Sequence, residues 1–261
     1  MKNVTETFLH DLGREAGELA LSLFTKVSFD VKDDESLVTE ADRRVQQLVV
    51  SRIHEAFPGH AFLAEEEGPM PGPAPSGADL CWAIDPIDGT AAFTAALSSW
   101  AICAGLLHQG QPVGGVMNVP RSGDLFLLAP GGTPRLNGAA LTGLRDPVIG
   151  KNTQIAVQSG SHRKFRITFP GKVRALGSVA SQLGYLAAGG FVASHVPRCR
   201  VWDLAAPMAL VYAVGGTLYN LDGTELDFRT LMNAGRAPQD MIACKRGFFG
   251  LFRPYFELLP K

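Results

Sequence analysis

The sequence predicts a layered protein of helices and sheets (α+β or α/β), with one sheet in each half of the chain. Apolar residues recur at helical spacing in two stretches before residue 60, which predicts two amphipathic helices. Residues 89–120 contain no Asp, Glu, Lys or Arg, and such continuous apolarity is typical of strands covered on both faces. Strands and helices alternate after about residue 150, which predicts a second, smaller α/β layer.

The first half, residues 1–150, should hold both helices and the larger sheet. We expect helices over residues 8–24 and within residues 37–57, the second ending at Pro58-Gly59. A strand should end in the three glutamates Glu65 to Glu67, and further strands are expected at residues 100–107, 113–119 and 125–129. Because short turns join the last three, they should form an antiparallel sheet with the two helices on one face.

The second half, residues 151–261, should be the smaller α/β unit. Its expected strands are residues 155–158, 173–176, 191–195, 217–221 and 241–244. Its expected helices are residues 178–188 and 202–214, with a short one near Phe256.

Composition excludes several classes of protein. The chain has 261 residues, 46% apolar content and a net charge of −1 without a basic block, so a globular protein that binds neither nucleic acid nor a membrane is expected. Residues 204–221 are uncharged, but Pro207 and Gly215-Gly216 interrupt them, so they do not predict a membrane span. The four cysteines are scattered, which indicates reduced thiols and a cytoplasmic location.

Acidic residues stand where acids are poor structural choices. Asp85 and Asp88 follow an apolar strand, Glu65 to Glu67 end another, and Asp42 and Asp203 lie in first turns of expected helices. If these positions converge, the carboxylates raise each other's pKa unless a cation lies among them. Oxygen ligands of this kind select Mg²⁺, Mn²⁺ or Ca²⁺ over zinc.

Each acidic position also has an ordinary structural explanation. Thr39 and Asp42 have the spacing of a helix cap, and Asp203 could be a helix-start acid. The three glutamates could be a solvated strand end, and Asp85-Pro86-Ile87-Asp88-Gly89 could be a turn. The turn explains the proline and glycine, but it does not explain why the motif adjoins a long uncharged segment.

The segment "WAIDPIDGTAAF" resembles the Asp-Pro-Ile/Leu-Asp-Gly-Thr motif of the inositol monophosphatase family, which are metal-dependent, lithium-sensitive phosphatases. Further segments match the family in order: "LVTEAD", "FLAEEEG", "LGSVASQLGYLAAGG" and "VWDLAA". The resemblance implies an α/β/α/β/α sandwich of the inositol monophosphatase and fructose-1,6-bisphosphatase type, with a large antiparallel first sheet.

The resemblance also implies roles for particular residues. Magnesium, about two or three ions with Mn²⁺ as an alternative, would be held by Glu65, Asp85, Asp88, Asp203 and the carbonyl of Ile87. The catalytic residues would be Asp42, Thr90 and Glu65, which position and activate the attacking water. Thr39 and Glu66 would support them. Lys32 stands where some members of the family place a lysine that faces the site. Phosphate and substrate would contact Gly89, Thr90, Gly177 and Ser178.

Substrate choice is where the sequence departs from the family pattern. Members that prefer inositol phosphate place an acid about seven positions before the Trp-Asp aspartate, where this chain has Val196, close to His195, Arg198 and Arg200. Arg198 and Arg200 could be solvated loop charges or could bind a second anionic group. The family resemblance implies an inositol-1-phosphate-like substrate, and the two arginines make 3'-phosphoadenosine 5'-phosphate or fructose 1,6-bisphosphate the alternatives. A non-catalytic metal- or phosphate-binding regulator is the alternative of another class.

Oligomeric state is open at this stage. Residues 159–177 leave little room for a helix that many family members carry near their dimer surface. A homodimer is therefore only one of the states that the sequence allows.

Overall fold

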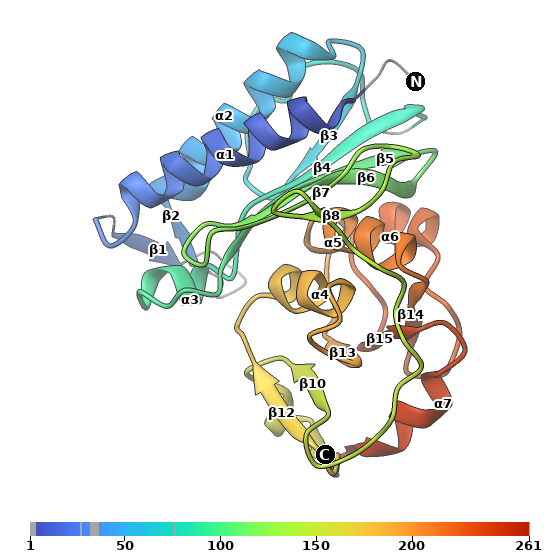
Figure 1. Ribbon diagram of the computed structural model, residues 1–261. Helices are drawn as coiled ribbons and strands as arrows, with labels where there is room; N and C mark the ends of the chain where they lie inside the picture. The colour runs from blue at the N-terminus through green and yellow to red at the C-terminus, as the bar shows by residue number, and fades with distance from the viewer. Residues whose placement is uncertain (1–3, 27, 32–36, 76, 261) are drawn as a thin grey trace.

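The structure is a computed structural model that describes residues 4–26, 28–31, 37–75 and 77–260. Lys32 lies outside the described residues. Five layers are stacked in the order helices, sheet, helices, sheet, helix (Figure 1). The layered α/β/α/β/α arrangement expected from the family resemblance is confirmed.

Two helices form the outer layer over the larger sheet. Helix α1 (Glu6–Leu23) packs on β6 and β7, and α2 (Glu40–Ala56) packs on β4. Each begins at a threonine whose side chain accepts hydrogen bonds from the first turn, Thr5 for α1 and Thr39 for α2. Residues Leu37–Thr39 are not helical: they form β2, which pairs antiparallel with β1 (Phe29–Val31), so the helix expected within residues 37–57 begins later.

The larger sheet has seven strands in the order β3-β4-β5-β6-β7-β8-β9. These are β3 (Ala61–Ala64), β4 (Leu80–Asp88), β5 (Ala101–His108), β6 (Gln111–Val119), β7 (Asp124–Leu128), β8 (Arg135–Leu136) and β9 (Ala139–Ala140). All neighbours are antiparallel except β3 and β4, which are parallel. The antiparallel arrangement expected for the three strands β5, β6 and β7 is confirmed, whereas the parallel pairing of β3 with β4 was not predicted.

The second sheet has five strands in the order β12-β10-β13-β15-β14. These are β10 (Gln154–Val157), β12 (Lys172–Ala175), β13 (Ala193–Val196), β14 (Gly216–Asn220) and β15 (Met241–Lys245). Helices α4 (Val179–Ala187) and α5 (Val201–Ala213) lie between the two sheets, beside the short α6 (Phe228–Ala234). Residues 141–153 connect the two sheets, and the division of the chain at residue 150 stays a prediction.

The short helix expected near Phe256 is present, but it ends before that residue. The last helix, α7 (Phe249–Phe252), is followed by a 3₁₀ turn (Arg253–Tyr255). Phe256, expected near a short helix, begins strand β16 (Phe256–Leu258), which pairs with β11 (Phe165–Ile167). The ring of Phe256 is fully buried against Phe165, so non-local apolar packing sets its conformation. Between residues 159 and 177 the structure has no α-helix, only the 3₁₀ turn Ser161–Arg163 and the strands β11 and β12.

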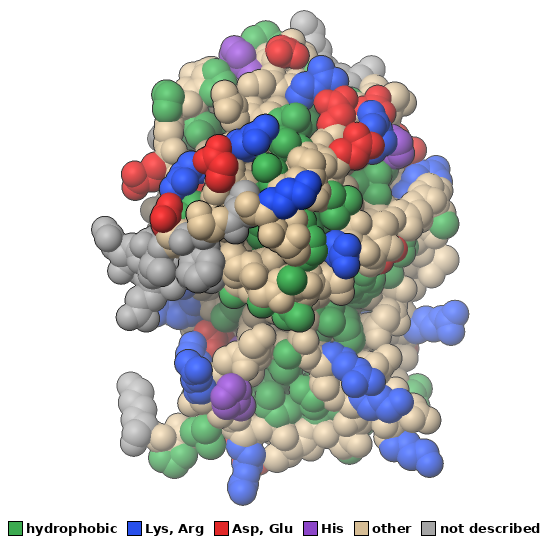
Figure 2. Space-filling view, turned by 90° about the vertical axis from the view of Figure 1, so that its left-hand side faces the viewer, with side chains coloured by type: hydrophobic (Ala, Val, Ile, Leu, Met, Phe, Trp, Pro, Cys, Tyr) green, Lys and Arg blue, Asp and Glu red, His purple; other side chains and the backbone are tan. Residues whose placement is uncertain are grey.

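Three apolar clusters hold the layers together. The first joins α1 and α2 to the larger sheet around Trp82 and Trp100, and the second joins that sheet to α4 and α5 around Phe126 and Leu204. The third lies under the second sheet around Phe252. On the face shown in Figure 2, Asp and Glu side chains gather over the upper half, while Lys and Arg dominate the lower half.

Candidate active site

A bulge in β4 brings the two acids of the Asp-Pro-Ile-Asp segment together. Asp85 pairs with Cys103 and Asp88 pairs with Ala101, and the register shifts between them. In a regular strand, residues three apart point to opposite faces. A bulge re-aims the side chains that follow it, and Pro86 suits the break because it has no N–H to donate to a ladder. Both carboxylates therefore contribute to one cluster.

Glu65 is placed by the parallel pairing of β3 and β4. Ala64 is the partner of Ile84, and the backbone N–H of Glu65 donates to the carbonyl of Ile84 at 3.1 Å. The residue after β3 therefore lies beside the residue after Ile84, which is Asp85. The charge of Glu65 is one of the causes that raise the pKa of Asp85.

Asp203 reaches the cluster because α5 packs unusually close to β5. A Cβ on Gly105 would lie 2.4 Å from the backbone nitrogen of Ala206, so only glycine allows this approach. Asp203 stands in the first turn of α5, where its Oδ2 accepts the N–H of Arg200 at 2.7 Å. The helix-start explanation and the convergence explanation both hold for this residue. Ligand oxygens of Asp85, Asp88 and Asp203 lie within 4.8 Å of one another.

The cluster is electrostatically unfavourable without a cation. Burial, followed by the charges of Glu65, Asp88 and Asp203, raises the pKa of Asp85 well above its ordinary value. Burial raises the pKa of Asp88 to about 6, and burial and the charge of Asp88 raise the pKa of Asp203 to about 7. Oδ1 of Asp85 is buried and has no hydrogen-bond partner among the described residues.

A divalent cation would supply the missing partner. An unpaired buried carboxylate oxygen is costly, and oxygen-only donors suit Mg²⁺. The residues present therefore fit the metal that the resemblance implies.

Asp88 is held from the other half of the chain. Its Oδ2 accepts hydrogen bonds from the hydroxyl of Ser178 and from the N–H of Ala180, the latter at 2.7 Å. Ser178 also caps α4 through the N–H of Ser181. The sequence predicts a substrate contact for Gly177 and Ser178, and that stays a prediction, but the structure shows the Ser178 hydroxyl engaged with Asp88.

Gly89 follows Asp88 in a left-handed conformation that favours glycine. Its φ is 91°, and a Cβ there would lie 2.9 Å from the carbonyl oxygen of Gly177. The short helix α3 (Thr90–Thr94) begins directly after it. The hydroxyl of Thr90 donates to the carbonyl of Ile87 at 3.1 Å, which ties the expected phosphate-binding residues to the bulge.

Thr39 and Asp42 form a capping box at the start of α2. The N–H and hydroxyl of Thr39 both donate to Oδ2 of Asp42, at 2.7 and 2.6 Å. Asp42 is fully buried, and its Oδ1 has no hydrogen-bond partner in the described part of the chain. Burial raises the pKa of Asp42 to about 6, with smaller contributions from Glu66 and Glu65.

The backbone of Glu66 is fixed by a buried glutamine that sequence reasoning missed. Gln46 accepts the N–H of Glu66 at 2.9 Å and donates to its carbonyl at 2.8 Å. Both residues are buried. Glutamine mid-helix carries no local signal for this role, because its partner is twenty residues away.

The residues expected near the substrate divide into two groups. Val196 is fully buried in β13, and His195 is buried against Ser161 and Asp240, so neither side chain is available to a ligand.

Arg198 and Arg200 are exposed at the start of α5. The guanidinium of Arg200 lies 5.3 Å from the ring centre of Trp202. Sequence reasoning missed Arg236, whose Nε donates to the carbonyl of Arg198 at 2.9 Å.

Comparison with known proteins agrees with the geometry. The model of the Inositol monophosphatase family matches residues 1–246. The chain is 30% identical to an inositol-1-monophosphatase of Mesorhizobium japonicum, over 81% of this chain and 80% of the relative. It is 29% identical to the Nus factor SuhB of Pseudomonas aeruginosa, over 81% and 83% of the two chains.

Solved structures show the same fold. An inositol monophosphatase (IMPase) from Thermotoga maritima matches with a TM-score of 0.81 and 24% identity, covering 95% of each chain. A structure described as an IMPase/NADP phosphatase complexed with Mg²⁺ and phosphate matches with a TM-score of 0.81 and 19% identity, over 96% of this chain and 94% of the other. Among the described residues, none of the helices combines the length and the apolarity needed to cross a membrane.

Proposed function

The chain belongs to the inositol monophosphatase family, and from that premise we propose that it is a Mg²⁺-dependent phosphomonoesterase acting on a small phosphorylated alcohol. One observation carries the proposal: Asp85, Asp88 and Asp203 are brought within 4.8 Å of one another from two halves of the chain. Glu65 lies beside Asp85, and one buried oxygen of Asp85 lacks a partner among the described residues. Such crowding of carboxylates destabilises the folded protein by itself, whereas a bound cation would neutralise their charges.

Mg²⁺ would be held by the carboxylates of Glu65, Asp85, Asp88 and Asp203 and by the carbonyl of Ile87. Once bound, it would supply charge neutralisation for the phosphoryl group and would lower the pKa of a water. Asp88 is pre-oriented for this role, because Ser178 and Ala180 fix its Oδ2. Asp203 is fixed in the same way by the N–H of Arg200.

Asp42, Thr39 and Thr90 would manage the attacking water. The Oδ2 of Asp42 is occupied by Thr39, so the carboxyl cannot rotate freely, and its unpartnered Oδ1 is the atom that would accept the proton. A pKa of about 6 leaves Asp42 ionised at neutral pH and close to the value that favours general-base catalysis. Thr90 donates its proton to Ile87, so its hydroxyl oxygen is left to accept one from the water.

The phosphate group would lie beside Gly89 and Thr90. Gly89 has no side chain on the segment that leaves the bulge, so a ligand can approach its backbone closely. Its neighbour Thr90 begins α3 directly after Asp88, which places both residues next to the acids. The substrate we expect first is inositol-1-phosphate-like, with 3'-phosphoadenosine 5'-phosphate and fructose 1,6-bisphosphate as the alternatives.

The test is release of inorganic phosphate from a panel of these three compounds and histidinol phosphate. Each is assayed with Mg²⁺, with Mg²⁺ and Li⁺, and with excess EDTA. We expect that at least one compound releases phosphate with Mg²⁺, that Li⁺ inhibits this release, and that no phosphate is released in EDTA. Binding of Mg²⁺ and phosphate without release from any compound would instead support a non-catalytic regulator.

A further inference from the structure

Arg198 and Arg236 brace each other across two loops. Nε of Arg198 donates to the carbonyl of Ala237 at 3.1 Å, and Nε of Arg236 donates to the carbonyl of Arg198 at 2.9 Å. The N–H of Ala237 donates in turn to the carbonyl of Cys199 at 2.8 Å. The segment before α5 and the segment after α6 are thereby held together through both arginines.

This brace uses only the inner nitrogen of each guanidinium. An arginine has five N–H donors, four of them on the two terminal nitrogens. Both side chains are exposed, and within the described ranges no carboxylate lies within ion-pair distance of either one. Two guanidinium groups are therefore fixed in place with their outer edges available, an arrangement that matches the oxygens of a phosphate.

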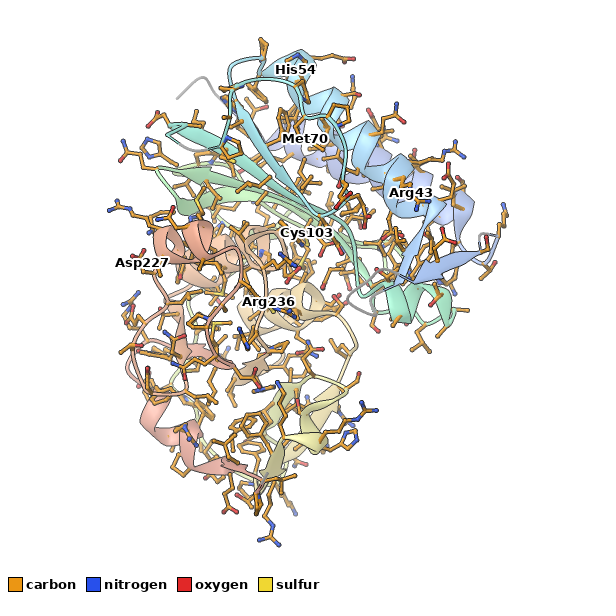
Figure 3. All side chains as sticks on the ribbon, turned by 180° about the vertical axis from the view of Figure 1, so that it is seen from behind. Arg43, His54, Met70, Cys103, Asp227 and Arg236 are labelled. Carbon is orange, nitrogen blue, oxygen red and sulfur yellow. The ribbon has the colours of Figure 1, made fainter. Side chains whose placement is uncertain are left out.

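The braced pair adjoins the acid cluster. Cys199 lies between Arg198 and Arg200, and the N–H of Arg200 donates to the cluster carboxylate Asp203. Arg236 lies at the junction of the two halves of the molecule in Figure 3, where Cys103, the strand partner of Asp85, is also labelled. Burial, and then the charge of Asp203, raise the pKa of the Cys199 thiol, whereas the charge of Arg236 lowers it.

The distribution of charge over the chain also favours binding of an anionic group beside the two arginines. Residues 151–261 carry 14 Lys and Arg against 6 Asp and Glu, whereas residues 1–150 carry 10 against 19. The braced arginines belong to the positive half and the Asp85 bulge to the negative half. A substrate whose scissile phosphate is bound with metal at the acids would meet positive charge with its remaining part.

We propose that Arg198 and Arg236 form a clamp for a second phosphate, so the substrate class is a small molecule carrying two phosphates of which one is cleaved. The inference rests on the proposed phosphatase function, and it favours the bisphosphate alternatives over the inositol-1-phosphate-like substrate that the family resemblance puts first. It replaces Arg200, whose guanidinium lies over Trp202, with Arg236 as the partner of Arg198. Nucleotide and sugar bisphosphates share this chemistry.

The test compares substrates that differ only in the second phosphate. The pairs are 3'-phosphoadenosine 5'-phosphate against adenosine 3'-phosphate, and fructose 1,6-bisphosphate against fructose 1-phosphate. The enzymes are wild type, Arg198→Gln, Arg236→Gln and Arg236→Lys. Arg229→Gln is the matched control, because Arg229 is also exposed and its Nε also donates to a backbone carbonyl, that of Gln109.

We expect wild type to prefer the bisphosphate of one pair. Both glutamine variants should raise KM for that bisphosphate roughly ten-fold or more and leave kcat/KM for its monophosphate within about two-fold. Arg236→Lys keeps the charge without the planar fork and should give an intermediate KM. Arg229→Gln should leave KM and kcat/KM unchanged for both the bisphosphate and the monophosphate.

Three results would overturn the clamp. Wild type could show no preference for either bisphosphate. The glutamine variants could lose kcat/KM equally on the bisphosphate and the monophosphate of a pair, or they could lose it on neither substrate. If Arg236→Gln does not fold, Arg236→Lys decides, since an unchanged KM for the bisphosphate there contradicts a fork contact. Mg²⁺-dependent hydrolysis of p-nitrophenyl phosphate by wild type is measured alongside. If wild type hydrolyses p-nitrophenyl phosphate, a negative result with the bisphosphates contradicts the clamp alone. If it does not, both the clamp and the phosphatase proposal are contradicted.

Discussion

At the scale of single residues, the acids near the bulge are crowded at the expense of stability, which fits a bound cation. Asp88 is buried and accepts two hydrogen bonds, yet its pKa still rises to about 6, because burial and neighbouring acids outweigh those bonds. The sequence predicted that Asp85, Asp88 and Asp203 could lie together, since each follows an apolar strand or starts a helix. It did not predict that Asp203 would be both a helix cap and a member of the cluster.

Asp88→Asn should nearly abolish turnover without unfolding the protein. The amide can still accept the hydrogen bonds from Ser178 and Ala180, but it removes a charge on which metal binding and transition-state stabilisation depend. In EDTA the variant should melt no lower than wild type, because repulsion within the cluster is relieved. Asp146→Asn, an exposed acid paired with Lys245, is the control and should keep full activity. Retention of most activity by Asp88→Asn at saturating Mg²⁺ would remove Asp88 from the site.

At the scale of elements, local patterns predicted the helices and the long strands well, and non-local pairing escaped them. The helices expected at residues 178–188 and 202–214 appear as α4 and α5 within one residue at each end. Strand β3 runs parallel to β4, and β11 pairs with β16 about ninety residues later, and neither relation has a local signal. The close contact of α5 with β5 was invisible for the same reason, although it delivers Asp203.

Gly105→Ala tests that contact. The added methyl group would lie 2.4 to 2.6 Å from Ala205 and Ala206, so α5 must move away from β5. We expect a loss of about 1–3 kcal/mol in the free energy of unfolding and a weaker apparent affinity for Mg²⁺, because Asp203 moves with the helix. Urea titration and the Mg²⁺ dependence of activity measure the two effects. Gly160→Ala, where a methyl group meets nothing within 4 Å, should change neither. An unchanged Mg²⁺ affinity in a destabilised Gly105→Ala protein would separate the packing from the site.

At the scale of the whole molecule, both halves contribute to the acid cluster. Asp85 and Asp88 come from the first half, and Asp203 comes from the second half together with the hydrogen-bond donors to Asp88. The sequence could predict the acid cluster, because its residues lie in compact motifs. It could not predict the Arg198 and Arg236 brace, because those residues are 38 positions apart and belong to no motif.

Metal-free protein should lose stability as pH rises. The folded state holds protons on Asp88 up to about pH 6 and on Asp203 up to about pH 7, whereas an unfolded Asp releases its proton near pH 3.8. The folded state therefore binds more protons between about pH 4 and 7, so these groups lower the free energy of unfolding across that window. In EDTA, the stability difference between Asp88→Asn and wild type should grow in favour of the variant from pH 4.5 to 7.5. A constant difference would show that Asp88 is not perturbed by the cluster.

The central claim is that the acids at the β4 bulge form a magnesium site that cleaves a phosphomonoester. Hydrolysis of p-nitrophenyl phosphate, followed against the concentration of free Mg²⁺ in wild type and in Asp85→Asn, tests it most directly. The account predicts no hydrolysis in EDTA, a saturable rise with Mg²⁺ in wild type, and at least roughly hundred-fold lower activity in Asp85→Asn at every Mg²⁺ concentration. Equal rates with Mg²⁺ and with EDTA, or an Asp85→Asn protein as active as wild type, would contradict it.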